Sequence, residues 1–148
     1  MSLVPAAPTG VLPAAFASTT VRAGPQGSSW LILPTSQPQN RALLGQLAIN
    51  DDESRVAALP SVDIEIRLRP GEDVRALCAK IIRREGYFRA VLVQSRGQVS
   101  PACANKCGSE RGGGTFPFRE CRTLPGFQDG ACGSCVWHSH GRKCTHHT

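Results

Sequence analysis

The sequence has few of the residues that build a large apolar core. Aromatic side chains make up 5% of its 148 residues, and it contains one methionine and one tyrosine. The hydrophobic fraction, 41%, lies slightly below that of ordinary globular domains. From this composition we do not expect a single large core, and the length allows one ordinary domain or two small ones.

Long apolar runs are also absent. No stretch reaches the roughly eighteen consecutive apolar residues that a membrane-spanning helix needs, so no membrane association is predicted. The segment Ala15 to Ser18 resembles a signal-peptidase site, but no basic segment precedes it, and Pro5, Pro8 and Pro13 interrupt the apolar run. We therefore expect an intracellular protein, nuclear or cytoplasmic. Secretion is the open alternative, and it would favour disulfides over metal binding.

Acidic residues are outnumbered by basic ones, 11 to 17, which gives a formal charge of +6 and a pI near 9.2. Such a surplus permits binding to nucleic acid but does not require it. Protein and nucleic acid therefore both remain candidate partners. If nucleic acid is bound, the candidate contacts are basic residues dispersed over the last third of the chain: Lys106, Arg111, Arg119, Arg122, Arg142 and Lys143.

The first part of the chain contains almost no charge. Residues 1–40 hold six prolines and one charged residue, Arg22. Because proline fixes φ and lacks a backbone N–H, this region is predicted to be a flexible arm without regular structure. Its one apolar cluster, residues 30–33, can dock as a short strand.

Residues 41–96 have the patterns of a small α+β unit. Residues 62–69 alternate apolar and charged side chains, which predicts a half-buried strand. An apolar stripe at helical spacing predicts a helix that contains Val74, Leu77, Cys78, Ile81 and Ile82. Residues 87–94 are expected to form a second strand, and residues 42–47 and 51–59 two short helices.

Residues 97–148 contain six of the seven cysteines and all four histidines. Two close pairs, separated by three and by two residues, can each supply one edge of a metal tetrahedron, as in structural zinc sites. The predicted metal ligands are all six: Cys103, Cys107, Cys121, Cys132, Cys135 and Cys144. The sequence thus predicts an α+β fold with a strand-helix-strand unit, a loop-dominated zinc-binding module and a flexible N-terminal arm.

The number of zinc ions, one or two, stays open. One arrangement is a single four-thiolate site from the two close pairs, which leaves Cys121 and Cys144 over. A second is a two-ion cluster with bridging sulfurs. A third completes a second site with His138, His140 or His146.

Two readings without zinc also remain. Three disulfides are possible because six is an even number, with Cys78 then left on the apolar face of its helix. A redox role for Cys132 and Cys135 is a further alternative, although the pair follows a loop rather than a strand. No set of catalytic residues is evident, and a non-enzymatic binding protein is predicted.

The cysteine-rich segment resembles a fungal domain family of unknown function. Members of that family carry a C-terminal pattern like C-x2-C, G-P-F-x2-C, G-A-C-x-N-C and G-x-R-C-S. The matching runs here are Cys103 to Cys107, Phe116-Pro117-Phe118-Arg119-Glu120-Cys121, Gly130-Ala131-Cys132-Gly133-Ser134-Cys135 and Gly141-Arg142-Lys143-Cys144. The first pair is separated by three residues instead of two, and Ser134 stands where asparagine is usual. The resemblance implies a zinc-finger-like module and assigns no activity.

Overall fold

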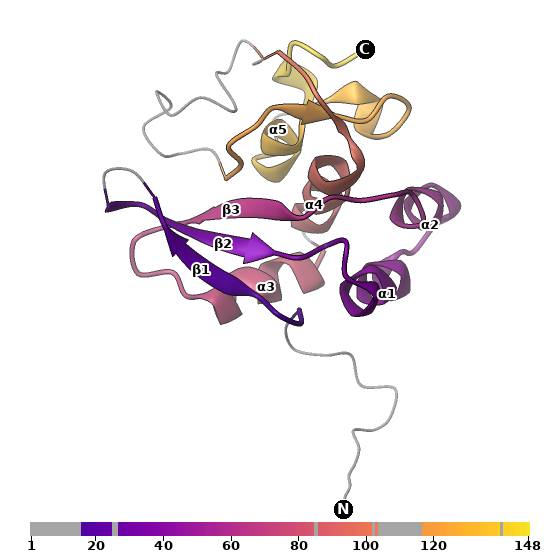
Figure 1. The fold of residues 1–148 in the computed structure, drawn as a ribbon. Coiled ribbons are helices and arrows are strands. Elements are labelled where there is room, and N and C mark those ends of the chain that lie inside the picture. The colour runs from indigo at the N-terminus through magenta and orange to yellow at the C-terminus, as the bar shows by residue number, and fades with distance from the viewer. Residues whose placement is uncertain (1–15, 25–26, 85, 102, 104–116, 140) are drawn as a thin grey trace, which may run out of the picture.

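The computed structural model describes residues 16–24, 27–84, 86–101, 103, 117–139 and 141–148 (Figure 1). A three-stranded antiparallel sheet contains β1 (Thr20–Ala23), β2 (Ser29–Leu33) and β3 (Ile64–Leu68) in that order. The helices are α1 (Pro38–Leu47), α2 (Asp51–Ala57), α3 (Val74–Ile82), α4 (Tyr87–Arg96) and α5 (Gly133–Trp137). The predicted α+β class is confirmed. Within the described residues, no helix is long and apolar enough to cross a membrane.

The sheet forms one wall of the apolar core. Leu31 lies opposite Ile66 in the antiparallel register, and both side chains are fully buried. Alternate residues point to the other face, as strand geometry requires. The predicted strand is therefore confirmed as β3. It begins at Ile64, and Val62 lies outside the ladder with 44% of its surface exposed.

The prediction of a flexible arm up to residue 40 is wrong for the described part of that region, but the expected short strand at residues 30–33 is confirmed as β2. β1 and β2 pair over four residues each, and Trp30 is buried. The prolines do not interrupt these strands, since Pro34 follows β2 and Pro38 opens α1. Proline is tolerated at the first turn of a helix, where its missing N–H would have had no partner. Residues 1–15 lie outside the described residues.

Helices α2 and α3 form where the sequence predicted them, and each begins at a capping residue. Asn50 accepts a hydrogen bond from the backbone N–H of Glu53 (2.8 Å), and Asp73 accepts one from Ala76 (2.7 Å). Such N-caps satisfy backbone donors that have no partner inside the helix. The apolar stripe of α3 is confirmed, because Leu77, Cys78 and Ile81 are buried.

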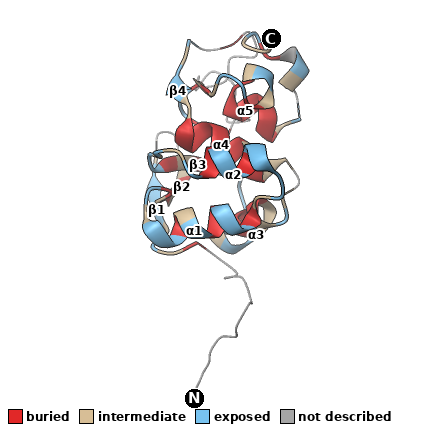
Figure 2. Cartoon of the chain, turned by 90° about the vertical axis from the view of Figure 1, so that its right-hand side faces the viewer, coloured by how far each residue is buried: buried red, intermediate tan, exposed pale blue. Residues whose placement is uncertain are grey.

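The expected second strand at residues 87–94 is wrong: this segment is helix α4. It packs against α2, α3, α5 and β5, and almost every residue from Phe88 onward is buried (Figure 2). A helix buried on all sides has a nearly continuous apolar run, which periodicity cannot distinguish from a buried strand. α4 lies between the sheet and the C-terminal segment (Figure 1).

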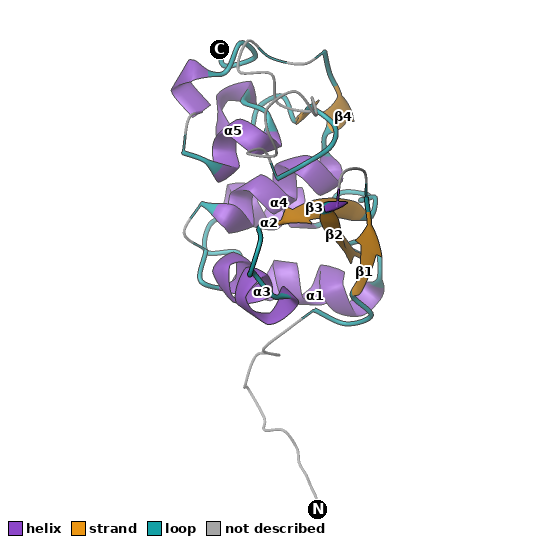
Figure 3. Ribbon diagram, turned by 90° about the vertical axis from the view of Figure 1, so that its left-hand side faces the viewer, coloured by secondary structure: helices purple, strands orange, loops and turns teal. Residues whose placement is uncertain are grey.

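The C-terminal segment is mostly loop with short elements (Figure 3). It contains β4 (Gln98–Val99), β5 (Arg122–Thr123), η3 (Gln128–Gly130), α5 and η4 (Gly141–Lys143). Its apolar side chains continue the core of the first part, since Phe118, Phe127 and Trp137 join the same buried cluster as Leu31 and Ile66. Apolar packing against the first part of the chain therefore helps to hold the described part of this segment, in addition to any metal.

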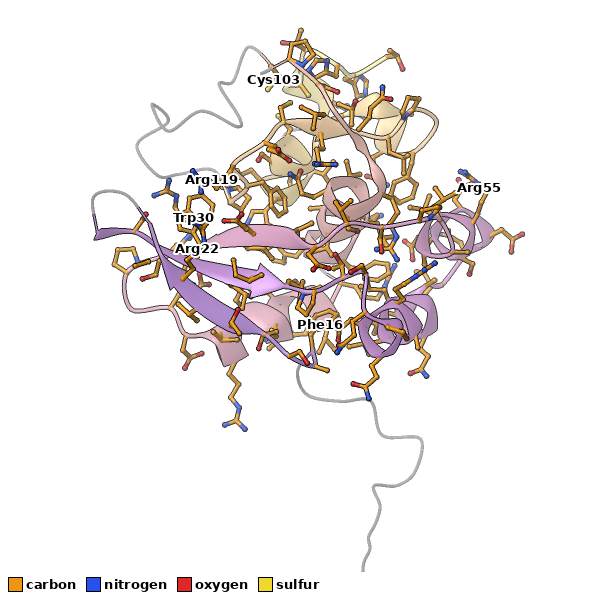
Figure 4. The ribbon with its side chains drawn as sticks, in the orientation of Figure 1. Phe16, Arg22, Trp30, Arg55, Cys103 and Arg119 are labelled. Atoms are coloured by element: carbon orange, nitrogen blue, oxygen red, sulfur yellow. The ribbon has the colours of Figure 1, made fainter. Side chains whose placement is uncertain are left out.

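Segment 117–119 extends the sheet beside β3. Phe118 forms a β-bridge with Ile66, and the Arg67 N–H donates to the Pro117 carbonyl (2.7 Å). On the opposite face the guanidinium groups of Arg67 and Arg119 lie 4.6 Å and 5.4 Å from the Trp30 ring centroid (Figure 4). The sheet thereby holds the start of the C-terminal segment in place.

Candidate metal centre

Four cysteine sulfurs come together at the end of the molecule away from the sheet. The Sγ atoms of Cys103, Cys132, Cys135 and Cys144 all lie within 4.8 Å of one another, and all four residues are buried. The Sγ atoms of Cys103 and Cys135 are 3.7 Å apart. No disulfide joins the described cysteines. This group of four residues is hereafter called the sulfur cluster.

Helix α5 presents two of the sulfurs. Cys132 is its N-cap residue, and Cys135 lies on its first turn. A separation of three positions places both side chains on the same face of a helical turn. The two-residue spacing seen in the sequence therefore produces one edge of the cluster.

Hydrogen bonds bring the other two sulfurs to this edge. The β4–β5 ladder and a bond from the Ser100 N–H to the Cys121 carbonyl (2.7 Å) hold the chain just before Cys103. His146 contacts the Pro101 carbonyl through Nε2 (2.7 Å), which ties the C-terminal turn to the same segment. Cys144 follows η4 directly and its Sγ accepts from the Cys132 N–H (3.3 Å).

Two glycines allow the backbone to pack closely here. Gly130 has φ +80°, and a Cβ on it would lie 2.9 Å from the His146 carbonyl oxygen. A Cβ on Gly133 would lie 2.6 Å from Oε1 of Gln94 in α4. A larger residue at position 130 would push the C-terminal turn away, and one at position 133 would displace the Gln94 side chain. The two glycines therefore permit the close packing around the sulfur cluster.

The sulfur cluster has the donor set and size of a tetrahedral thiolate site. Zinc–sulfur bonds of about 2.3 Å place the sulfurs of a regular tetrahedron about 3.8 Å apart. The measured 3.7 Å between Cys103 and Cys135 matches this edge, and it is far longer than the roughly 2.05 Å of a disulfide. The cluster can therefore hold a metal ion.

The surroundings of Cys144 favour its thiolate form. Burial alone would raise the pKa of this thiol, but hydrogen bonds from the backbone N–H groups of Cys132 and His146 and from the Cys132 and Cys135 side chains outweigh it. Its pKa is consequently below the ordinary value. Metal binding requires the deprotonated sulfur, so this environment lowers the cost of forming a ligand.

The other predicted site residues are placed as follows. Cys107 and His140 lie outside the described residues. Cys121 is buried, 4% exposed, and is not one of the four cluster residues. Nε2 of His146 contacts the Pro101 carbonyl, and no described histidine is part of the sulfur cluster. Participation of all six cysteines stays a prediction. The sequence spacing did not show that Cys144 would lie beside Cys103 and the second close pair.

Cys78 is expected to have no part in metal binding. Its side chain is fully buried in α3, and burial raises the pKa of its thiol, against a smaller lowering by a backbone hydrogen bond with Phe16. We expect Cys78→Ala to lower the free energy of unfolding by about 1 kcal/mol, since it removes one small buried group. Chemical denaturation and metal analysis of the purified variant test this. A loss of bound metal would contradict it.

Comparisons with known proteins identify one family for part of the chain. Neither the curated proteins nor the solved structures gave a match. A family model does match, over residues 90–147, which run from within α4 through the sulfur cluster. This segment is thus similar to the family described as "Protein of unknown function (DUF3716)".

Proposed function

We propose that the sulfur cluster binds zinc and that the ion has a structural role in a non-enzymatic binding protein. The observation that carries the proposal is the convergence of four buried cysteine sulfurs within 4.8 Å of one another. Soft thiolate ligands select zinc among the abundant divalent ions, whereas magnesium and calcium prefer oxygen.

A structural role is favoured over a catalytic one. Four protein ligands fill the tetrahedral shell of zinc, while catalytic sites use three and leave a position for water or substrate. All four sulfurs belong to residues that are at most 5% exposed, so a bound ion would be shielded from solvent. The ion would then connect the segment before residue 104 to α5 and to the C-terminal turn.

The partner of the module is proposed to be a macromolecule, and protein is favoured over nucleic acid. Two of the arginines that were candidate phosphate contacts are already engaged. Arg119 pairs with Glu65 (3.7 Å), and Arg122 pairs with Glu120 (2.8 Å). Charge that is compensated within the fold attracts a polyanion less.

Cobalt substitution tests the proposal. We expect protein stripped of metal under reducing conditions to bind one equivalent of cobalt(II) at the sulfur cluster. It should then show the intense visible bands of tetrahedral cobalt with thiolate ligands, and zinc should displace the cobalt. Weak octahedral bands, or no uptake, would contradict thiolate coordination.

The same titration decides the role of Cys121. If a second ion binds as the six-cysteine prediction allows, the wild-type protein will take up two equivalents and Cys121→Ser one. If the sulfur cluster is the complete site, both proteins will take up one equivalent, and the prediction of six ligands will be wrong. Cys78→Ser is the matched control, because it makes the same substitution at a buried cysteine of α3.

A further inference from the structure

A cavity of about 530 Å³ lies between the start of α4 and the C-terminal loops. Gly86 and Arg89 line it from α4 and its N-cap. Ser139, Arg142 and His147 line it from the segments that follow Cys135 in the sequence. The cavity is distinct from the sulfur cluster, because none of the four cysteines lines it.

Two positively charged side chains, Arg89 and Arg142, line this cavity. Neither Arg89 nor Arg142 forms an ion pair within the part of the chain that the structure describes. Among the described residues that line the cavity, Asp129 is acidic, and one of its carboxylate oxygens lies 3.5 Å from Nε2 of His147. The positive charges of two arginines that line one cavity repel each other, and an anion bound in the cavity would offset this repulsion.

The groups in the cavity match a phosphate. Each arginine presents planar N–H donors that bind two oxygens of a phosphate at once. His147 and the Ser139 hydroxyl add polar groups to the same wall. The α4 helix, whose N-cap Gly86 has no side chain to accept a hydrogen bond, adds a partial positive charge. An anion in this cavity would therefore be near two full positive charges and further donors.

We infer that this cavity binds the terminal phosphate group of a small phosphorylated molecule, through Arg89 and Arg142. A cavity of this size accommodates a small ligand rather than a duplex, since ligand sites usually measure about 300–1,000 Å³. The inference does not depend on the identity of the metal, because its two arginines lie outside the sulfur cluster.

Isothermal titration of the full-length protein with inorganic phosphate near neutral pH tests this inference. We expect saturable binding at one site, and about tenfold weaker binding for Arg89→Gln and for Arg142→Gln, because each variant loses charge-assisted hydrogen bonds. Arg55→Gln is the control, since Arg55 is an exposed arginine of α2 away from the cavity (Figure 4). Metal content and circular dichroism of every variant show whether the fold and the sulfur cluster are intact.

The source of the phosphate is identified by two further ligands. A nucleoside 5′-monophosphate should bind at least as well as phosphate, and the same two variants should weaken it. Absence of phosphate binding, or equal binding by the wild type and both cavity variants, would overturn the inference. Preferential binding of an unphosphorylated oligonucleotide would also overturn it, since backbone phosphates would then be the ligand. Wild-type protein that binds phosphate but contains no metal would count against the zinc proposal alone.

Discussion

Replacing Cys135 with serine is expected to abolish stoichiometric metal binding and to destabilise α4 together with the C-terminal segment. Removal of a ligand should cost more than the roughly 10- to 100-fold in affinity that loss of an outer-shell partner costs. A 100-fold loss of affinity corresponds to about 2.7 kcal/mol of stability. The effect should reach α4, because Cys135 and Trp137 share one buried cluster with Phe88 and Val91.

Hydrogen exchange locates this loss of stability. We expect faster amide exchange in residues 117–148 and in α4 of Cys135→Ser, with a smaller change in β2. In Cys78→Ser, a change of the same chemistry in α3, metal content should be unchanged. If Cys135→Ser retained a full equivalent of metal, the assignment of this cysteine to the site would be wrong.

Replacing Arg96 with methionine is expected to lower the free energy of unfolding by about 2–3 kcal/mol. Arg96 is 8% exposed and donates to the carbonyl groups of Val56 (3.2 Å) and Ala57 (2.8 Å) at the end of α2. The Ala57 carbonyl would lose the Arg96 donor, while the Val56 carbonyl keeps the Leu59 N–H (3.0 Å). An unsatisfied buried group costs about 1–3 kcal/mol. Loss of the buried charge offsets part of this cost, since burial and the nearby Arg41 lower the pKa of Arg96 to about 10.

Urea denaturation of the variant measures this effect. Arg55→Gln is the matched control on α2. Its arginine side chain is 55% exposed and its ion pair with Asp52 measures 3.5 Å, so the change should cost less than about 0.5 kcal/mol. Equal stabilities of Arg96→Met and wild type would show that the α2 carbonyls do not need Arg96.

Elements with a local signature were predictable from the sequence. The alternation around β3 and the apolar stripe of α3 each bury one face, and Asp73 marks the start of α3 by its own hydrogen bond. Strand β1 carried no such signature, and for β2 the sequence offered only the apolar cluster at residues 30–33. β1 pairs with β2, and β2 pairs with β3, which lies more than thirty residues further along the chain. Burial of Trp30 in β2 adds to their stability. Non-local pairing of this kind leaves no period in the sequence.

The candidate site was predictable in its chemistry and not in its geometry. Cysteine type and the two-residue spacing indicated a thiolate metal site, and Cys132 and Cys135 do share one turn of α5. Which remote cysteines join them depends on the β4–β5 ladder and on the contact between His146 and Pro101. These contacts link segments more than twenty residues apart, so spacing alone could not predict that Cys103 and Cys144 lie together beside α5.

Native mass spectrometry of the full-length protein, purified under reducing conditions, tests the central claim most directly. We predict a mass increase of one or two zinc ions per chain, with all seven cysteines reduced, and release of the metal on acidification because protonated thiols do not bind it. The zinc proposal would be contradicted by a chain that carries no metal and whose mass is below that of the reduced chain by the hydrogens lost in disulfides among the six C-terminal cysteines.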